Sequence, residues 1–193
     1  MLLILFFTLV GCSQKQDSLD KEVFLFFYFE EKAAEKAGLF SAYSYDLHYW
    51  YKAKDSLITA KIGEYGVFRD PSLTRTKDGE FHLVWTCGSS GFGYAHSNNG
   101  VNWEDIKFIT VEDSTRNLNF ANVWAPEFYT EGDSTYVIWS STLTKDYIPP
   151  KDPKKWWNST WNHRLYYTAT TDFKDFSPYP YGHGRIDLLY NPV

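Results

Sequence analysis

The chain has 193 residues, enough for one domain with a sizeable hydrophobic core. Aromatic residues make up 20% of it, a content that suits β-sheet packing, a sugar-facing cleft, or both. The formal net charge of −5 argues against nucleic acid as a partner, because no basic stripe is present to bind phosphates. Since there are only two cysteines, a metal site built from cysteine is excluded.

The first residues predict a bacterial lipoprotein signal. Residues 2–10 form an apolar run that is too short to span a bilayer and has the length of a signal-peptide core. The phrase Leu-Val-Gly-Cys that ends at Cys12 resembles the lipobox, whose cysteine is acylated after cleavage. We therefore expect a signal at 1–12 with Cys12 as lipid anchor, a tether at 13–22, and a protein held to a membrane in the bacterial cell envelope. The alternative is a buried N-terminal strand that contains a cysteine.

The next segments predict β-structure. Residues 23–29 form a strongly apolar, aromatic run typical of a buried strand. Residues 30–36 are charged and predict a turn. Residues 39–44 and 48–52 predict a hairpin.

One phrase then occurs twice, about one structural unit apart. In each copy a proline with a neighbouring carboxylate precedes a turn and an apolar strand. The copies are residues 69–73, 77–79 and 81–86, and residues 124–128, 131–133 and 135–140. Pro71 and Pro126 are 55 positions apart, so the period is close to 50 residues of strand and turn. Such a period predicts a β-propeller.

The carboxylates beside these prolines are Asp70 and Glu127. We expect them to occupy the same place in successive blades and so to converge on the central axis, where carboxylates can cleave glycosidic bonds. For Asp70 the alternative is a turn-capping residue.

A second repeated phrase closes each unit: a strand ends in small or polar residues, a turn follows, and a large aromatic residue begins the next strand. It occurs at residues 42–46 before Trp50, at 95–100 before Trp103, and at 168–172 before Phe176. The Asp and Asn-Gly positions tolerate a left-handed backbone. We expect the three aromatic residues to pack between blades.

Together the repeats predict an all-β chain containing about two to three propeller blades, fewer than the ~4–8 of a closed ring. We therefore interpret residues 23–193 as the N-terminal part of a longer β-propeller. An irregular insertion at 149–163 carries Trp156, Trp157 and Trp161, and either borders a cleft or caps a blade.

The phrases at 68–73, 123–128 and 165–173, with a weaker match at Ile186-Asp187, resemble glycoside hydrolase family 43. These are five-bladed β-propeller enzymes that act on arabinose- and xylose-containing polysaccharides. The resemblance implies that Asp70 is the general base and that Asp187 tunes the pKa of the proton donor. The family's donor glutamate, usually in a Glu-Gly-Pro phrase, has no match, and Glu127 matches a position that shapes the pocket.

The same resemblance leaves other roles open. The Arg-Asp-Pro phrase at Arg69 also resembles that of invertase-like relatives, in which the aspartate stabilises the transition state. Some relatives carry Ca²⁺ on the propeller axis, but no ligand set is legible here, so we expect no cofactor.

Further candidate substrate-binding residues have structural alternatives. Trp124 either stacks on a sugar ring or belongs to the core. Asn122 and His82 either bind sugar hydroxyls or support the fold. Arg69 either pairs with a carboxylate in the pocket or lies on the surface.

The leading hypothesis is an inverting glycoside hydrolase. Such a reaction needs a base and an acid roughly 6.5–9.5 Å apart. Asp70 and Asp187 are 117 positions apart, about two repeats, so both can reach one axial pocket. The alternatives are a non-catalytic carbohydrate-binding propeller and a structural propeller with a protein-binding face.

Overall fold

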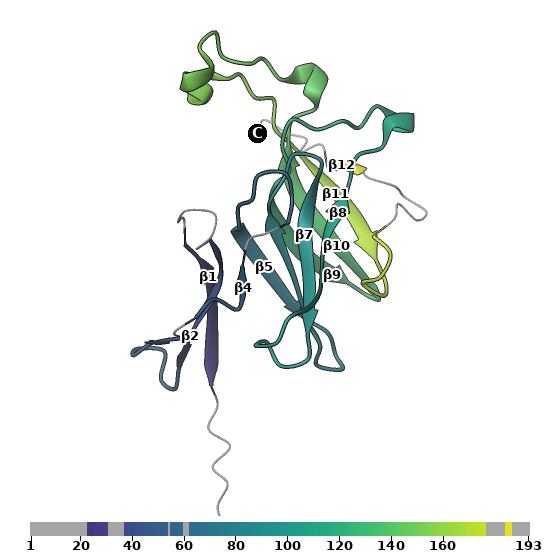
Figure 1. Ribbon diagram of the computed structural model, residues 1–193. Helices are drawn as coiled ribbons and strands as arrows, with labels where there is room; N and C mark the ends of the chain where they lie inside the picture. The colour runs from purple at the N-terminus through teal and green to yellow at the C-terminus, as the bar shows by residue number, and fades with distance from the viewer. Residues whose placement is uncertain (1–22, 31–36, 54, 60–61, 177–183, 187–193) are drawn as a thin grey trace, which may run out of the picture.

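The structure is a computed structural model, and it describes residues 23–30, 37–53, 55–59, 62–176 and 184–186. It contains three antiparallel sheets of four strands each, which follow one another along the chain (Figure 1). This confirms the prediction of an all-β fold built from propeller blades, of which the chain contains a part. In the described part of the chain, no helix has the length and apolarity needed to cross a bilayer.

Each sheet is formed by consecutive strands. The first sheet contains β1 (Phe24–Phe29), β2 (Gly38–Ser44), β3 (Tyr51–Lys52) and β4 (Ile58–Thr59). The second contains β5 (Arg69–Arg75), β6 (Phe81–Thr86), β7 (Gly91–Ser97) and β8 (Glu104–Thr110). The third contains β9 (Trp124–Glu131), β10 (Ser134–Ser141), β11 (Arg164–Thr170) and β12 (Gly184–Ile186). Short 3-10 helices lie at Ser114–Arg116, Thr144–Asp146 and Pro153–Asn158.

The first strands of the sheets lie next to one another, as the inner strands of neighbouring blades do. β1 contacts β5, and β5 contacts β9. A direct hydrogen bond joins the last two, because the backbone N–H of Phe128 in β9 donates to Ser72 Oγ in β5 at 3.2 Å. In Figure 1 the first sheet (purple) is followed by the second (blue to teal) and the third (green to yellow).

Apolar side chains fill the space between successive sheets. One core cluster joins the first two sheets and includes Leu39, Ile58, Leu83, Trp85 and Trp103. A second joins the second and third sheets and includes Val84, Phe92, Val137, Trp139 and Phe176. Consecutive residues of β6 point to opposite faces of their sheet, and those after Phe81 are all buried. Both faces of this sheet are therefore covered, because it lies between two others. In β10 burial alternates, since among the described residues one face of the third sheet is covered and the other is not.

The second repeated phrase folds into the same turn three times. A Ser or Thr hydroxyl accepts the N–H of the residue three positions on at 2.9 Å in every copy. The Asp or Asn two positions on accepts a further N–H at 2.9 Å, and the following residue has positive φ. The three sets are Ser44, Asp46 and Leu47; Ser97, Asn99 and Gly100; and Thr170, Asp172 and Phe173.

The aromatic residues after these turns differ in burial. Trp103 is 9% exposed and Phe176 is 6% exposed, so both pack between sheets as expected. For Trp50 the described structure does not show this packing: it is 42% exposed. Trp50 lies with Phe26, Tyr28 and Lys52 around a groove of about 470 Å³ on the first sheet. Trp50 and Trp103 follow the same kind of turn, but in the described structure no second sheet packs against Trp50.

Candidate functional site

The phrase around each repeated proline forms a β-bulge at the start of its sheet. Arg69 pairs with Thr86 and Ser72 with Val84, so β5 has one more residue than β6 in this interval. β9 has the same irregularity opposite β10. A proline has no N–H to donate to the ladder, which favours such an interruption.

The residue before the proline has a left-handed backbone in both copies. Asp70 has φ of 50° and Ala125 has φ of 48°. Aspartate tolerates this region better than alanine does. Because both copies share it, the conformation follows from how a blade begins, and it turns the side chain of Asp70 out of the regular alternation of the strand.

Thr86 fixes the carboxylate of Asp70 at the junction of the second and third sheets. Its hydroxyl donates to Asp70 Oδ2 at 3.0 Å and accepts the backbone N–H of Ala125 at 2.8 Å. Asp70 is exposed whereas Thr86 is buried. The result is a positioned carboxylate that faces solvent. Arg69 is also exposed and is paired in register with Thr86.

Replacing Thr86 tests this junction. We expect Thr86→Val to lower the free energy of unfolding by about 1–2 kcal/mol, because two part-buried hydrogen bonds of its hydroxyl, to Asp70 Oδ2 and from the Ala125 N–H, would be lost. Thr86→Ser keeps the hydroxyl and should cost much less. Urea unfolding of both variants measures the difference, and equal stability of the two would contradict this role for the hydroxyl.

Trp124, the first residue of β9, belongs to a cluster of aromatic rings. Its ring centroid lies 5.1 Å from that of Trp161 and 5.3 Å from that of His163. Trp161 also lies 4.5 Å from Tyr147. His163 Nδ1 is 3.3 Å from Ser140 Oγ, and burial lowers the pKa of His163 below its ordinary value. These half-buried rings are directly connected to the Asp70 site, because Ala125 follows Trp124.

Glu127 does not share the place of Asp70. When the two bulges are superposed by their pairing, Ala125 corresponds to Asp70 and Glu127 corresponds to Ser72. Glu127 pairs with Ile138, on the face of the third sheet that is turned away from the second. The expectation of equivalent carboxylates was therefore wrong. The sequence contained the signal, since Asp70 precedes its proline and Glu127 follows one.

Asn122 serves the fold. It is fully buried, its Nδ2 donates to Ser140 O at 3.2 Å, and its Oδ1 accepts the N–H of Thr142 at 3.0 Å. Both ends of the amide therefore bind the end of β10 and the residue after it. We correct the expectation that Asn122 binds sugar hydroxyls: its structural alternative is the one the contacts support.

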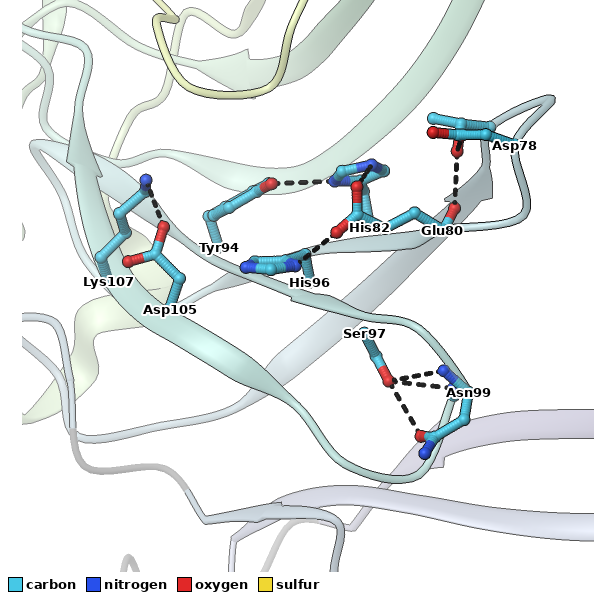
Figure 2. Close-up of polar contacts among 11 residues, drawn as sticks. Asp78, Glu80, His82, Tyr94, His96, Ser97, Asn99, Asp105 and Lys107 are labelled. Carbon is cyan, nitrogen blue, oxygen red and sulfur yellow. Dashed lines mark hydrogen bonds and ion pairs between the residues drawn. The ribbon is translucent and has the colours of Figure 1, made fainter.

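His82 also lies away from Asp70. It is near the start of β6, whereas Thr86 is the last residue of that strand, so the two are about 13 Å apart along it. His82 is 3% exposed, and its Nδ1 is 2.8 Å from Tyr94 Oη. Its ring stacks on Phe173 with a centroid distance of 3.6 Å. Figure 2 shows it beside Tyr94, Glu80 and His96. This burial corrects the expectation of a sugar contact at His82.

Two predicted residues, Asp187 and Cys12, lie outside the described residues, so their roles stay predictions. Within the described ranges, no group of three or more His, Cys, Asp or Glu side chains is placed to hold a metal ion. The sequence reasoning missed Thr86 and His163. A signal for Thr86 existed, because the hydroxyl residue after each repeated tryptophan, Thr86 or Ser140, is paired with the residue that opens the bulge.

A family model described as a probable glycosyl hydrolase domain, related to family 43, matches residues 20–183, and the chain belongs to this family. No curated protein matches the chain.

Three solved structures support the fold. An exo-1,5-alpha-L-arabinanase from a bovine ruminal metagenomic library is 14% identical, with a TM-score of 0.55 over 85% of this chain and 55% of that one. The GH43 endo-arabinanase from Bacillus licheniformis is 14% identical, with a TM-score of 0.52 over 86% and 56%. The Bombyx mori GH32 beta-fructofuranosidase is 17% identical, with a TM-score of 0.53 over 84% and 34%. The chain thus spans between a third and somewhat over half of these proteins.

Proposed function

We propose that the chain is part of an inverting glycoside hydrolase that cleaves O-glycosidic bonds in arabinose- or xylose-containing polysaccharides, with Asp70 as the general base. The observation that carries the proposal is the Asp70 carboxylate itself. It is exposed, held by Thr86 at 3.0 Å, and connected through Ala125 to the aromatic rings at Trp124. Membership of the family supports the reaction class.

The chemistry assigns one proton transfer to Asp70. Its carboxylate takes a proton from water while the water oxygen bonds to the anomeric carbon and the glycosidic C–O bond breaks. The departing oxygen then needs a proton from an acid about 6.5–9.5 Å from the base. By resemblance that acid is a glutamate that this sequence does not match, and Asp187 would raise its pKa by charge repulsion.

The leaving group separates the two functions experimentally. A dinitrophenyl arabinofuranoside or xyloside releases a weakly basic phenolate that needs little protonation, whereas an alkyl glycoside depends on the acid. In the protein made from its full reading frame, we expect Asp70→Asn to lower kcat/KM by about 10²-fold or more on both substrates.

Glu131→Gln is the matched control and should leave kcat/KM unchanged, because Glu131 is exposed at the end of β9 that is far from Ala125. Unchanged turnover in Asp70→Asn would remove Asp70 from the mechanism. A protein that binds the sugars and hydrolyses neither substrate would instead be the non-catalytic carbohydrate-binding propeller.

A further inference from the structure

The segment between β10 and β11, residues 142–163, is a long connection that we call the arm. In Figure 1 it is the green segment that stands beyond the ends of the strands, at the top of the view. Its base is held to the loop before β9, because Thr142 O accepts the N–H of Ala121 at 2.8 Å, and it is closed by Thr142 Oγ1, which accepts the N–H of Asn162 at 3.1 Å. The arm therefore projects from a fixed point beside Trp124.

Hydrogen bonds along the arm hold its two sides together. Ile148 and Thr160 exchange both backbone bonds, at 3.1 and 2.9 Å. Tyr147 Oη lies 3.0 Å from Ser159 Oγ, and Ser159 Oγ donates to Trp156 O at 2.6 Å. An arm built in this way holds its aromatic rings in place before a ligand arrives, which lowers the entropic cost of binding.

The inner half of the arm continues the Asp70 site. Trp161 stacks with His163, at a centroid distance of 5.4 Å and an interplanar angle of 21°, and covers part of Trp124. On its other side Trp161 meets Tyr147.

The outer half carries two indoles that are largely exposed in the described structure. Trp156 is 61% exposed and Trp157 is 62% exposed, and their rings meet edge to face at 6.2 Å. Large exposed aromatic patches mark interaction sites, and flat indole faces complement the C–H faces of sugar rings.

The base of the arm distinguishes a sugar ligand from a lipid surface. A cavity of about 490 Å³ there is lined by Asn117, Asn119, Thr144 and Lys145. Amide, hydroxyl and ammonium groups bind sugar hydroxyls, whereas a loop that only inserts into a membrane has no use for such a cavity. The same end of the molecule carries the exposed carboxylate of Asp70.

We infer that the arm is a glycan-binding wall, which extends the Asp70 site so that the protein binds a chain of several sugars. Trp161 and His163 form the inner contact, and Trp156 and Trp157 form an outer one. This inference rests on the proposed function for the sugar class, but binding by stacking does not require the Asp70 carboxylate.

The test is a calorimetric titration of the protein with arabino- and xylo-oligosaccharides of one to six units. We expect affinity to rise at least about tenfold with length, and Trp161→Ala to lose about tenfold at every length. The double variant Trp156→Ala/Trp157→Ala should bind short oligosaccharides as the unchanged protein does, but its affinity should no longer rise with oligosaccharide length. Tyr129→Ala is the control, since Tyr129 is 53% exposed on the third sheet and should change nothing.

Asp70→Asn separates this inference from the proposed function. Asp70→Asn should bind oligosaccharides as the unchanged protein does, even though its turnover falls. Affinity that does not depend on length, or a double variant that binds like the unchanged protein, would overturn the inference while leaving the role of Asp70 intact. Loss of binding to phosphatidylglycerol vesicles in the double variant, with sugar binding unaffected, would overturn it in favour of a membrane contact.

Discussion

Trp103→Ala is expected to lower the free energy of unfolding by about 3–5 kcal/mol, whereas Trp50→Ala should lower it by about 1 kcal/mol. Trp103 is 9% exposed and packs between the first and second sheets, with Phe27 edge to face at 6.3 Å. Removing the Trp103 ring would leave a cavity in the core between these two sheets, and the surrounding side chains can fill it only in part. Trp50 is 42% exposed and loses mainly its contact with Phe26.

The comparison is controlled because both tryptophans follow the same turn. Ser44 and Ser97 accept hydrogen bonds from equivalent N–H groups, so the local structure before the two tryptophans is the same. The two side chains differ in how deeply they are buried. The buried Nε1 of Trp103 has no hydrogen-bond partner in the described structure, so Trp103→Phe should be milder than Trp103→Ala. Urea unfolding followed by circular dichroism gives the three values. Equal losses for Trp103→Ala and Trp50→Ala would show that the first two sheets do not share a core.

The strands and turns of this chain are legible in its sequence because they depend on local chemistry. The run at 81–86 appears as the strand β6 with those bounds. The repeated Ser-x-Asx and Thr-x-Asx phrases fold alike because each side chain binds backbone N–H groups only two or three residues away. No distant partner is needed for either pattern.

The burial of Trp50 could not be predicted in the same way. Its local sequence resembles that before Trp103 and Phe176, and only the presence of a neighbouring sheet distinguishes them. A pattern within one repeat gives the direction of a side chain relative to its own sheet. It does not say whether another sheet covers that face.

The site shows the same limit. Asp70 was identified from its phrase, but the contact that orients it comes from Thr86, and that hydroxyl is placed by pairing between β5 and β6. Asn122 was a reasonable sugar ligand until its amide was seen to bind the end of β10. The contact of Trp161 with Trp124 joins the arm to the start of β9, and no short-range pattern encodes it.

His82 gives the second large effect, a loss of stability in acid. The pKa of His82 is lowered from 6.5 to about 4, chiefly by burial and also by the nearby His96, although Glu80 and Asp78 oppose the change. Glu80 Oε2 is 3.6 Å from His82 Nε2, and Glu80 Oε1 is 2.6 Å from His96 Nδ1 (Figure 2). The imidazole is thus neutral in the folded protein at pH values where it would be charged in the unfolded chain.

The sign of the effect follows from this difference in proton binding. Between pH 6.5 and about 4 the unfolded chain binds more protons at His82 than the folded protein does, so stability falls as the pH is lowered through this window. A pKa shift of this size corresponds to at most about 3 kcal/mol of folding stability. This contribution is fully present above pH 6.5 and fully lost below pH 4. Protonation also adds a charge beside Phe173, whose ring stacks on the imidazole and joins the second sheet to the third.

The measurement is the slope of unfolding free energy against pH, from 7 down to 5, a range chosen to lie above the ordinary carboxylate pKa values of about 4. We expect His82→Gln to flatten this slope even though it lowers stability at neutral pH, because Gln does not titrate. His48→Gln is the matched control: His48 is exposed, and the slope should stay as it is. If His82→Gln and the unchanged protein lose stability in parallel, the acid sensitivity arises elsewhere, and the contact between His82 and Phe173 does not depend on a neutral imidazole.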